Sequence, residues 1–267
     1  MKYWRNMFEG SSMTILRICL ESIGNASLKS PDSKHLVSRN VYIQPHQEHG
    51  YAASTSYLVQ SVWSMVLSAL SGRTDIMFRY LLHGRDEDVA DSDQTIGCCV
   101  TGRPFRVQIN DTMPITELAS AVQKQVHSSA PHAHLGSNTI ANKCTDWPSC
   151  GRLDHHSSFV LHQSVPAKDH WPVGDAGYLH VEKSDPEFQM VYDVDLLTTS
   201  RASGELSLES RCLKEAFSID EVNAVARAFV VAFGSIVHGV GTLGNVLEKL
   251  LRVPALPVVV SGNTVGS

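Results

Sequence analysis

The chain has 267 residues, of which 43% are hydrophobic and 18% charged, and its formal net charge is −5. This ordinary globular composition excludes a disordered tail, a collagen-like repeat and a disulfide-rich miniprotein. A chain with a small negative charge has no general attraction to nucleic acid or anionic lipid, so we expect neither nucleic acid nor membrane as a partner. The length fits one large domain or two small ones.

Neither the cysteines nor the N-terminus indicates a metal site or export. The six cysteines are dispersed and form no CxxC pair, so we expect reduced thiols and no bound metal. The N-terminal residues lack the uninterrupted apolar segment of a signal peptide. The most apolar run, residues 228–237, is too short to cross about 30 Å of hydrocarbon. We therefore predict a cytoplasmic protein.

Apolar residues at helical spacing predict the helices. Residues 2–24 indicate short helical turns interrupted at residues 9–12. Further helices are predicted over residues 53–71, 114–128, 135–142 and 218–240. The last of these begins at Ser218, where Ser218 and Glu221 have the spacing of a capping box.

Alternating or β-rich runs between turn residues predict the strands. They lie at residues 35–43, 75–82, 96–100, 105–109, 158–162, 178–181, 188–194 and 205–212. Helices interspersed with strands indicate an α/β fold with a mixed sheet. We interpret residues 253–267 as a tail or linker stub.

Several segments of the sequence resemble, in order, segments of one half of a known enzyme domain. The clearest is IGCCVTGRPFR at 96–106, which follows Gly84-Arg85 and the helix expected over 53–71. The others are YWRNMFEGSSMT at 3–14, PHAHLG at 131–136, CTDWP at 144–148 and HQ at 162–163. Together these segments resemble the C-terminal half of the condensation domain of fungal-type nonribosomal peptide synthetases.

The resemblance implies a chloramphenicol-acetyltransferase-like fold, an α/β subdomain in which helices flank a mixed β-sheet. Residues 1–252 would form this C-terminal subdomain, without the N-terminal catalytic subdomain. The resemblance also implies a set of tunnel or motif positions: Gly84, Arg85, Gly97, Thr101, Pro104, Arg106, His162 and Gln163. In the family, such a tunnel receives the phosphopantetheine arms of carrier proteins. We therefore expect peptidyl or aminoacyl carrier domains as partners, no directly bound cofactor, and pairing with a complementary subdomain or a second copy of the chain.

The catalytic motif of that family does not occur in this sequence. In the family, the second histidine of an HHxxxDG motif positions or deprotonates the attacking amine, so an Asp must follow it at the fourth position. None of the thirteen histidines has that Asp. Three histidines remain as candidates for a different proton handler: His156 in a His-His pair, His162 in the HQ segment, and His170, whose Asp175 is one residue too far.

Several matched positions also depart from the family pattern. Thr101 stands where the family has Asn, and Arg103 where it has an apolar residue. Arg79 stands where the family normally has Gly, in a strand where a cation is costly unless it is paired. These departures indicate relaxed constraint on transfer chemistry.

We interpret the chain as a truncated condensation-domain-like protein of secondary-metabolite biosynthesis that does not form amide bonds alone. Two alternatives stay open, so whether the chain is itself an enzyme stays open too. One is an active acyltransferase or cyclising enzyme that uses a non-standard histidine. The other is a protein that only binds carrier proteins or acts as a scaffold.

Overall fold

The computed structural model describes residues 1–16, 34–42, 54–82, 91, 94, 96–97, 99–147, 158–165, 170–180, 193–201, 205–214, 216–239 and 241–257. Its helices are α1 (Lys2–Phe8), α2 (Thr55–Ser71), α3 (Ile115–Ser129), η4 (Ala130–His132), α4 (Ser137–Cys144), η5 (Gly174–Ala176), α5 (Ile219–His238) and α6 (Leu243–Leu251). Its strands are β1 (Lys34–Tyr42), β2 (Asp75–Leu82), β3 (Thr101–Gln108), β4 (Ser158–Val165), β5 (His170–Pro172), β6 (Tyr178–His180), β7 (Val194–Arg201) and β8 (Glu205–Leu213). None of the described helices is both long and apolar enough to cross a membrane.

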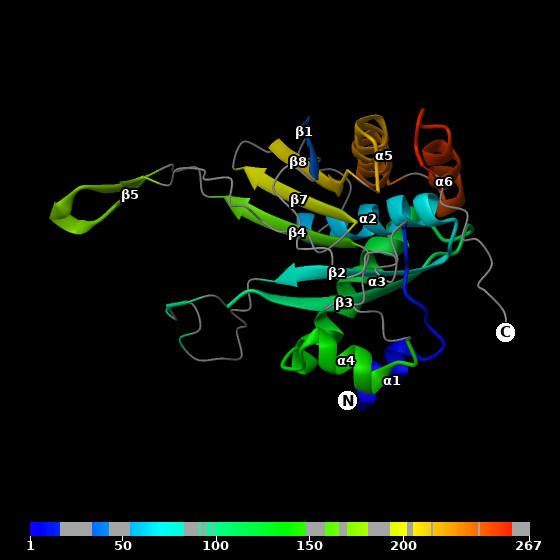
Figure 1. Ribbon diagram of the computed structural model, residues 1–267, viewed down its shortest axis with the longest axis horizontal. Helices are drawn as coiled ribbons and strands as arrows, with labels where there is room; N and C mark the ends of the chain where they lie inside the picture. The colour runs from blue at the N-terminus through cyan, green and yellow to red at the C-terminus, as the bar shows by residue number, and fades with distance from the viewer. Residues whose placement is uncertain are drawn as a thin grey trace.

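Six strands form one mixed sheet in the order β1-β8-β7-β4-β2-β3, and β5 and β6 form a separate small hairpin (Figure 1). β4 runs parallel to both β2 and β7, whereas the other neighbouring pairs are antiparallel. The carboxyl ends of β2, β4 and β7 therefore meet at one edge of the sheet. This arrangement confirms the expected α/β fold with a mixed sheet flanked by helices.

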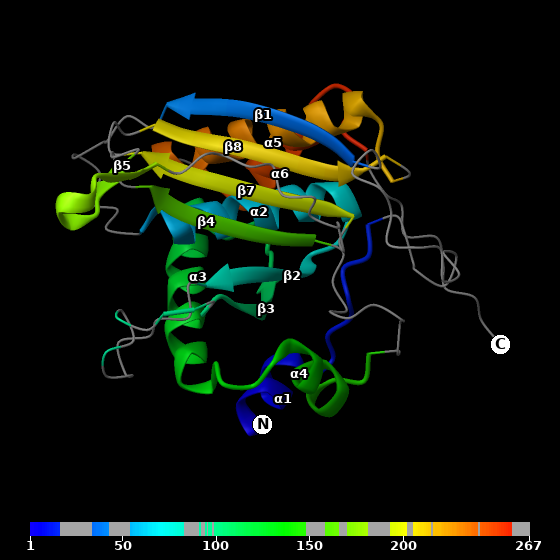
Figure 2. The same cartoon turned by 60° about the vertical axis from the view of Figure 1, so that its left-hand side comes forward.

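Helices α2 and α5 cover one face of the sheet. Figure 2 shows strands β1, β8, β7 and β4 in front of these helices, with no described helix on the near face of the four strands. The side chains of β8 alternate strictly, since residues 206, 208, 210 and 212 are buried and the odd-numbered ones are partly exposed. This alternation is what one covered and one open face require.

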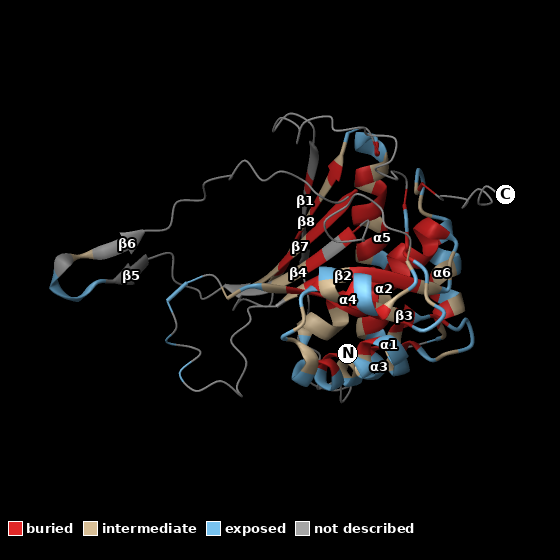
Figure 3. Cartoon of the chain, turned by 60° about the horizontal axis from the view of Figure 1, so that its bottom comes forward, coloured by how far each residue is buried: buried red, intermediate tan, exposed pale blue. Residues whose placement is uncertain are grey.

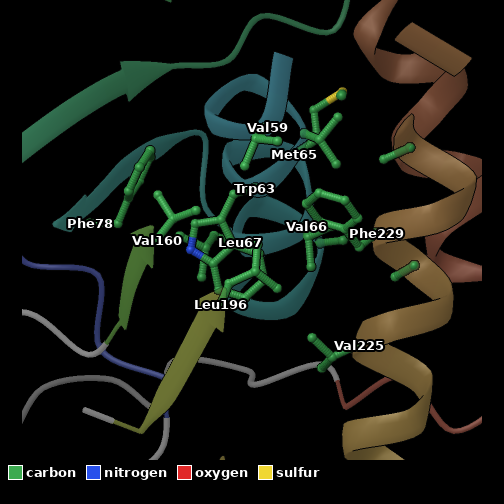
Figure 4. Packing of buried hydrophobic residues seen from close by; sticks show 14 of the residues in the cluster. Val59, Trp63, Met65, Val66, Leu67, Phe78, Val160, Leu196, Val225 and Phe229 are labelled. Atoms are coloured by element: carbon green, nitrogen blue, oxygen red, sulfur yellow. The ribbon is translucent and has the colours of Figure 1, made fainter. Parts of the chain in front are cut away.

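The central helix α2 is the most deeply buried element of the fold (Figure 3). Trp63 on α2 is fully buried, and Figure 4 shows it among Val160 of β4 and Leu196 of β7. Each large apolar side chain buried in this way contributes about 1.5–3 kcal/mol. Gly72 ends the helix in the left-handed conformation at φ 66°, as the Ser71-Gly72 stop signal predicts.

The hairpin of β2 and β3 is covered on both faces. Phe78 and Phe105 face the large core with α2 and α3, and their ring centroids lie 5.3 Å apart. Met77 faces the opposite way and packs with Trp4 of α1 and Ile140 of α4 in a second, smaller cluster. The described residues therefore form two hydrophobic clusters separated by this hairpin.

Several predictions from the sequence are confirmed, and the prediction of one strand is wrong. The capping box at Ser218 is present, with both reciprocal hydrogen bonds to Glu221. The strand expected over 96–100 does not form, because Ile96 and Val100 are exposed and the ladder with β2 begins only at Thr101.

The helical pattern near the C-terminus comprises two helices. α5 matches the helix predicted over residues 218–240, and α6 is a further helix, with its own capping box at Thr242, that was not predicted. In the expected tail, Val253 and Leu256 pack against the large core, and residues 258–267 lie outside the described part of the chain. The strand expected over 188–194 lies almost wholly outside the described residues, and β7 begins at Val194.

Candidate functional site

Arg106, one of the predicted motif positions, is a structural anchor between β3 and the N-terminal helix. Its guanidinium donates to both carboxylate oxygens of Asp75, at 2.8 and 3.0 Å. The remaining nitrogen donates to the backbone carbonyls of Met7 and Glu9 at 2.8 and 3.0 Å. The rigid guanidinium satisfies four acceptors at once, which a lysine could not do. Arg106 therefore fixes the end of α1 against the sheet.

Three other segments of the resemblance, at 3–14, 131–136 and 144–148, meet around the small cluster of Trp4, Met77 and Ile140. Trp4 is fully buried, and its indole nitrogen donates to the carbonyl of His132 at 3.1 Å. Trp147 of the CTDWP segment donates to the carbonyl of Ser11 at 3.1 Å. The ring of Trp147 lies 5.5 Å from that of Phe8. These segments are thus brought together to build the α1–α4 layer over β2 and β3.

Arg79 and Gly102 form a second contact on this face of the hairpin. A Cβ atom on Gly102 would overlap the guanidinium of Arg79, so the glycine leaves the space that the arginine occupies. Pro104, another predicted position, lies opposite Arg79 in the ladder and is buried. The carbonyl of Gly102 also accepts from the buried hydroxyl of Ser137 at 2.9 Å. The unusual Arg79 is therefore accommodated by a specific neighbour.

The remaining described positions of this motif lie at the start of β3. Thr101 pairs with Leu82 at the last rung of the β2–β3 ladder and is partly exposed. Gly97 has a φ of 138°, which favours glycine, and it lies before the strand begins. Thr101 begins β3, whereas His162 belongs to β4, so the two motif positions lie on different strands.

His162 lies in the middle of β4, paired with Thr198 of the neighbouring strand β7. Its Nδ1 is 2.9 Å from the hydroxyl of Thr198, and its Nε2 is 3.4 Å from that of Ser200. His162 and Ser200 are partly exposed, whereas Thr198 is fully buried. Burial lowers the pKa of His162 below its ordinary value of 6.5, so the imidazole is neutral near pH 7. A neutral imidazole between two hydroxyls is a group that can accept a proton.

A polar cluster on the face of β2 and β3 that contacts α3 was missed at the sequence level. Tyr80 and Arg103 lie opposite each other in the ladder, and both are almost fully buried. Burial raises the pKa of Tyr80, and the neighbouring Ser129 and Arg103 oppose that rise. Burial also raises the pKa of Tyr3, whose hydroxyl shares a hydrogen bond with Ser128 at 2.9 Å. No periodicity places these side chains together, because they come from α1, β2, β3 and α3.

The other candidates are not assembled into one centre. His170 lies in β5, opposite His180, and so belongs to a different sheet from His162. Gln163 is the next residue of β4 after His162 and pairs with Thr199. Gly84, Arg85 and His156 lie outside the described residues. Within the described ranges, no three His, Cys, Asp or Glu side chains gather as a metal would require.

The chain matches the family model of the condensation domain over residues 1–238. It is 32% identical over 205 residues to the nonribosomal peptide synthetase gloA of Glarea lozoyensis, which covers 75% of this chain and 3% of that protein. It is 27% identical over 177 residues to the nonribosomal peptide synthetase opaA of Aspergillus ustus, which covers 66% of this chain and 4% of that protein.

Two solved structures share the fold. The starter condensation domain of the rhizomide synthetase RzmA superposes with a TM-score of 0.63 at 13% identity, over 91% of this chain and 52% of that one. A complex of the X-domain and OxyB from teicoplanin biosynthesis superposes with a TM-score of 0.68 at 18% identity, over 96% of this chain and 55% of that one.

The chain belongs to the condensation domain family of nonribosomal peptide synthetases. It spans about half the length of the two solved chains just described, and a few per cent of the length of the two synthetases. Its fold is the chloramphenicol-acetyltransferase-like fold expected for that family.

Proposed function

We propose that this chain acts as the C-terminal subdomain of a condensation domain, supplies one wall of the tunnel for carrier-bound thioesters, and does not form amide bonds alone. The observation that carries the proposal is the extent of the match, which covers most of this chain and about half of each solved domain. The family match over residues 1–238 supports the same reading.

The contacts of Arg106 and Trp4 support a shaping function for this part of the motif. Arg106 and Trp4 connect secondary-structure elements through hydrogen bonds that fold the subdomain. None of the thirteen histidines of the sequence is followed by Asp at the fourth position, as the family's catalytic motif requires. Condensation is largely a matter of positioning two thioesters, so a wall of the tunnel contributes through shape.

The partners proposed for the chain are carrier proteins and a complementary subdomain. The substrates would arrive on phosphopantetheine arms, and this chain would bind the arms without a resident cofactor. In the motif segment before β3, Ile96 is fully exposed and Val100 is 55% exposed. Exposed apolar side chains of this kind favour contact with a second protein surface. The complementary subdomain is the occupant we propose for that contact.

An assay with loaded carrier proteins tests this proposal. The purified chain is mixed with aminoacyl- and peptidyl-loaded carriers, alone or with the separately expressed N-terminal half of a condensation domain from the Glarea lozoyensis relative. The complete domain of that relative is the positive control, and mass spectrometry measures the amide product. We expect product only when the complementary half is present. Amide product from the chain alone would overturn the proposal, as would a failure to bind both carriers and the complementary half.

A further inference from the structure

Three polar side chains on β4 and β7 form a continuous hydrogen-bonded series that the proposed function does not use. The Thr198 hydroxyl donates to the carbonyl of Leu161 at 3.3 Å. The Thr198 oxygen lies 2.9 Å from Nδ1 of His162. On the other side of the ring, Nε2 of His162 lies 3.4 Å from Oγ of Ser200. The series therefore runs from a backbone carbonyl through an imidazole to a second hydroxyl.

The direction of the hydrogen bonds fixes where the imidazole proton lies. A threonine hydroxyl has one proton, and Thr198 uses it on the carbonyl of Leu161. The Thr198 oxygen must then accept from His162, which places the proton of the neutral ring on Nδ1. Nε2 consequently carries a lone pair, and that lone pair is next to the hydroxyl of Ser200. This is the relation between a base and the hydroxyl that it deprotonates.

Burial separates the three residues into an inner and an outer part. Thr198 is fully buried, as a residue that only orients the ring should be. His162 and Ser200 are partly exposed, so a substrate can approach them from solvent. All three lie on the sheet's own strands, which hold side chains more rigidly than loops do.

We propose that Ser200 is an acyl-accepting nucleophile, that His162 is its general base, and that Thr198 is a positioning residue for His162. The substrate class is an acyl thioester. This inference goes beyond the proposed function, which assigns no covalent step to the chain by itself.

The proposed step is a simple exchange of an ester for a thioester. The Ser200 oxygen forms a bond to the thioester carbonyl carbon while its proton passes to Nε2 of His162. The carbon–sulfur bond then breaks, and the protonated imidazole returns the proton to the leaving thiolate. The products are an O-acylserine and a free thiol, so no oxidant, reductant or metal is required.

The acyl thioester of N-acetylcysteamine is the probe for this step. The whole chain is incubated with the acetyl thioester, and intact-mass and peptide-mapping measurements locate the acetyl group. Neutral hydroxylamine removes acetyl groups from cysteine but leaves an oxygen ester in place, which separates Ser200 from the six cysteines. We expect one hydroxylamine-resistant acetyl group on Ser200.

Matched variants test whether the arrangement of His162 and Ser200 is responsible for the acetyl labelling. Ser200→Ala should abolish the label, and His162→Gln should slow it by about 10²–10⁴-fold, the usual contribution of a general base. Ser207→Ala is the control, because Ser207 is a partly exposed serine on neighbouring β8 whose hydroxyl bonds only to a backbone carbonyl among the described residues. It should label at the wild-type rate.

Thr198 is tested by rescue. Thr198→Val should slow labelling about tenfold, and Thr198→Ser, which keeps the hydroxyl, should restore it. Circular dichroism and thermal denaturation establish that each variant is folded. Absence of a resistant label on Ser200 in the folded chain would overturn the inference, and so would an unchanged labelling rate in folded His162→Gln. Neither result would bear on the tunnel function, which is measured by the carrier assay.

Discussion

Replacing Arg106 by Met should destabilise the subdomain by about 3 kcal/mol, because the guanidinium has four acceptors. The hydrogen bonds to the carbonyls of Met7 and Glu9 should contribute about 1 kcal/mol each. The bidentate pair with Asp75 should add about 1 kcal/mol, since the side chains retain only 13% and 25% of their exposure and water screens them in part. Against a typical total stability of about 5–15 kcal/mol, this is a large loss.

Urea denaturation followed by tryptophan fluorescence measures this loss. The midpoint should fall while the slope stays unchanged, because the same surface is exposed on unfolding. Arg211→Met is the matched control, since Arg211 pairs only with Glu209 of its own strand among the described contacts, and it should cost less than about 1 kcal/mol. Equal losses for the two variants would refute the structural role of Arg106.

Hydrogen exchange provides a second, local readout of the same change. Arg106 holds the carboxyl end of α1, so its loss should speed amide exchange in residues 2–8 more than in the central helix α2. A uniform change across the chain would instead mean that α1 and α2 open together and that the anchor is not local.

Three further predictions concern contacts described above. Gly102→Ala should lower stability by about 1–3 kcal/mol in thermal denaturation, because the new methyl group meets the guanidinium of Arg79. In a chain that also carries Arg79→Ala, most of that loss should disappear. An equal loss with and without Arg79 would disprove the contact. Burial raises the pKa of Tyr80 above its ordinary 10.0, so the stability that its neutral side chain contributes is complete below about pH 10 and is lost at higher pH. Tyr80→Phe should therefore reduce the fall in stability at alkaline pH, and an identical fall in both proteins would contradict the raised pKa. Burial lowers the pKa of His162, so the unfolded chain binds a proton at this imidazole more readily than the folded chain, and stability falls as the pH drops below about 6.5. The urea midpoint should therefore decline less from pH 7.5 to 5.5 in His162→Gln than in the wild type. An equal decline in the two proteins would contradict the lowered pKa.

Local signals in the sequence predicted most of the elements. The capping box of Ser218 and Glu221 spans four residues, and the stop at Gly72 is a single residue, so both could be identified without knowledge of the fold. The strand expected over 96–100 failed for the opposite reason. Its apolar residues Ile96 and Val100 are exposed, and whether an apolar run is covered by a neighbouring layer is a property of the tertiary structure.

The candidate site could be predicted only in part. The resemblance selected Arg106 and His162 as important positions, but it did not indicate what either residue contacts. The partners of Arg106 in α1 are 97 and 99 residues away, and Thr198 and Ser200 lie 36 and 38 residues after His162. Such contacts depend on strand order and register, which no local pattern contains.

Strand β2 lies between the two hydrophobic clusters and contributes side chains to both. Its neighbouring residues Met77 and Phe78 belong to different hydrophobic clusters, so substitutions at these two adjacent positions should destabilise different parts of the molecule. The smaller cluster, built on Trp4 and Ile140, shares none of its described members with the larger one, so we expect it to open at a lower free energy. A calorimetric enthalpy larger than the van't Hoff value would reveal this as two unfolding units within one short chain.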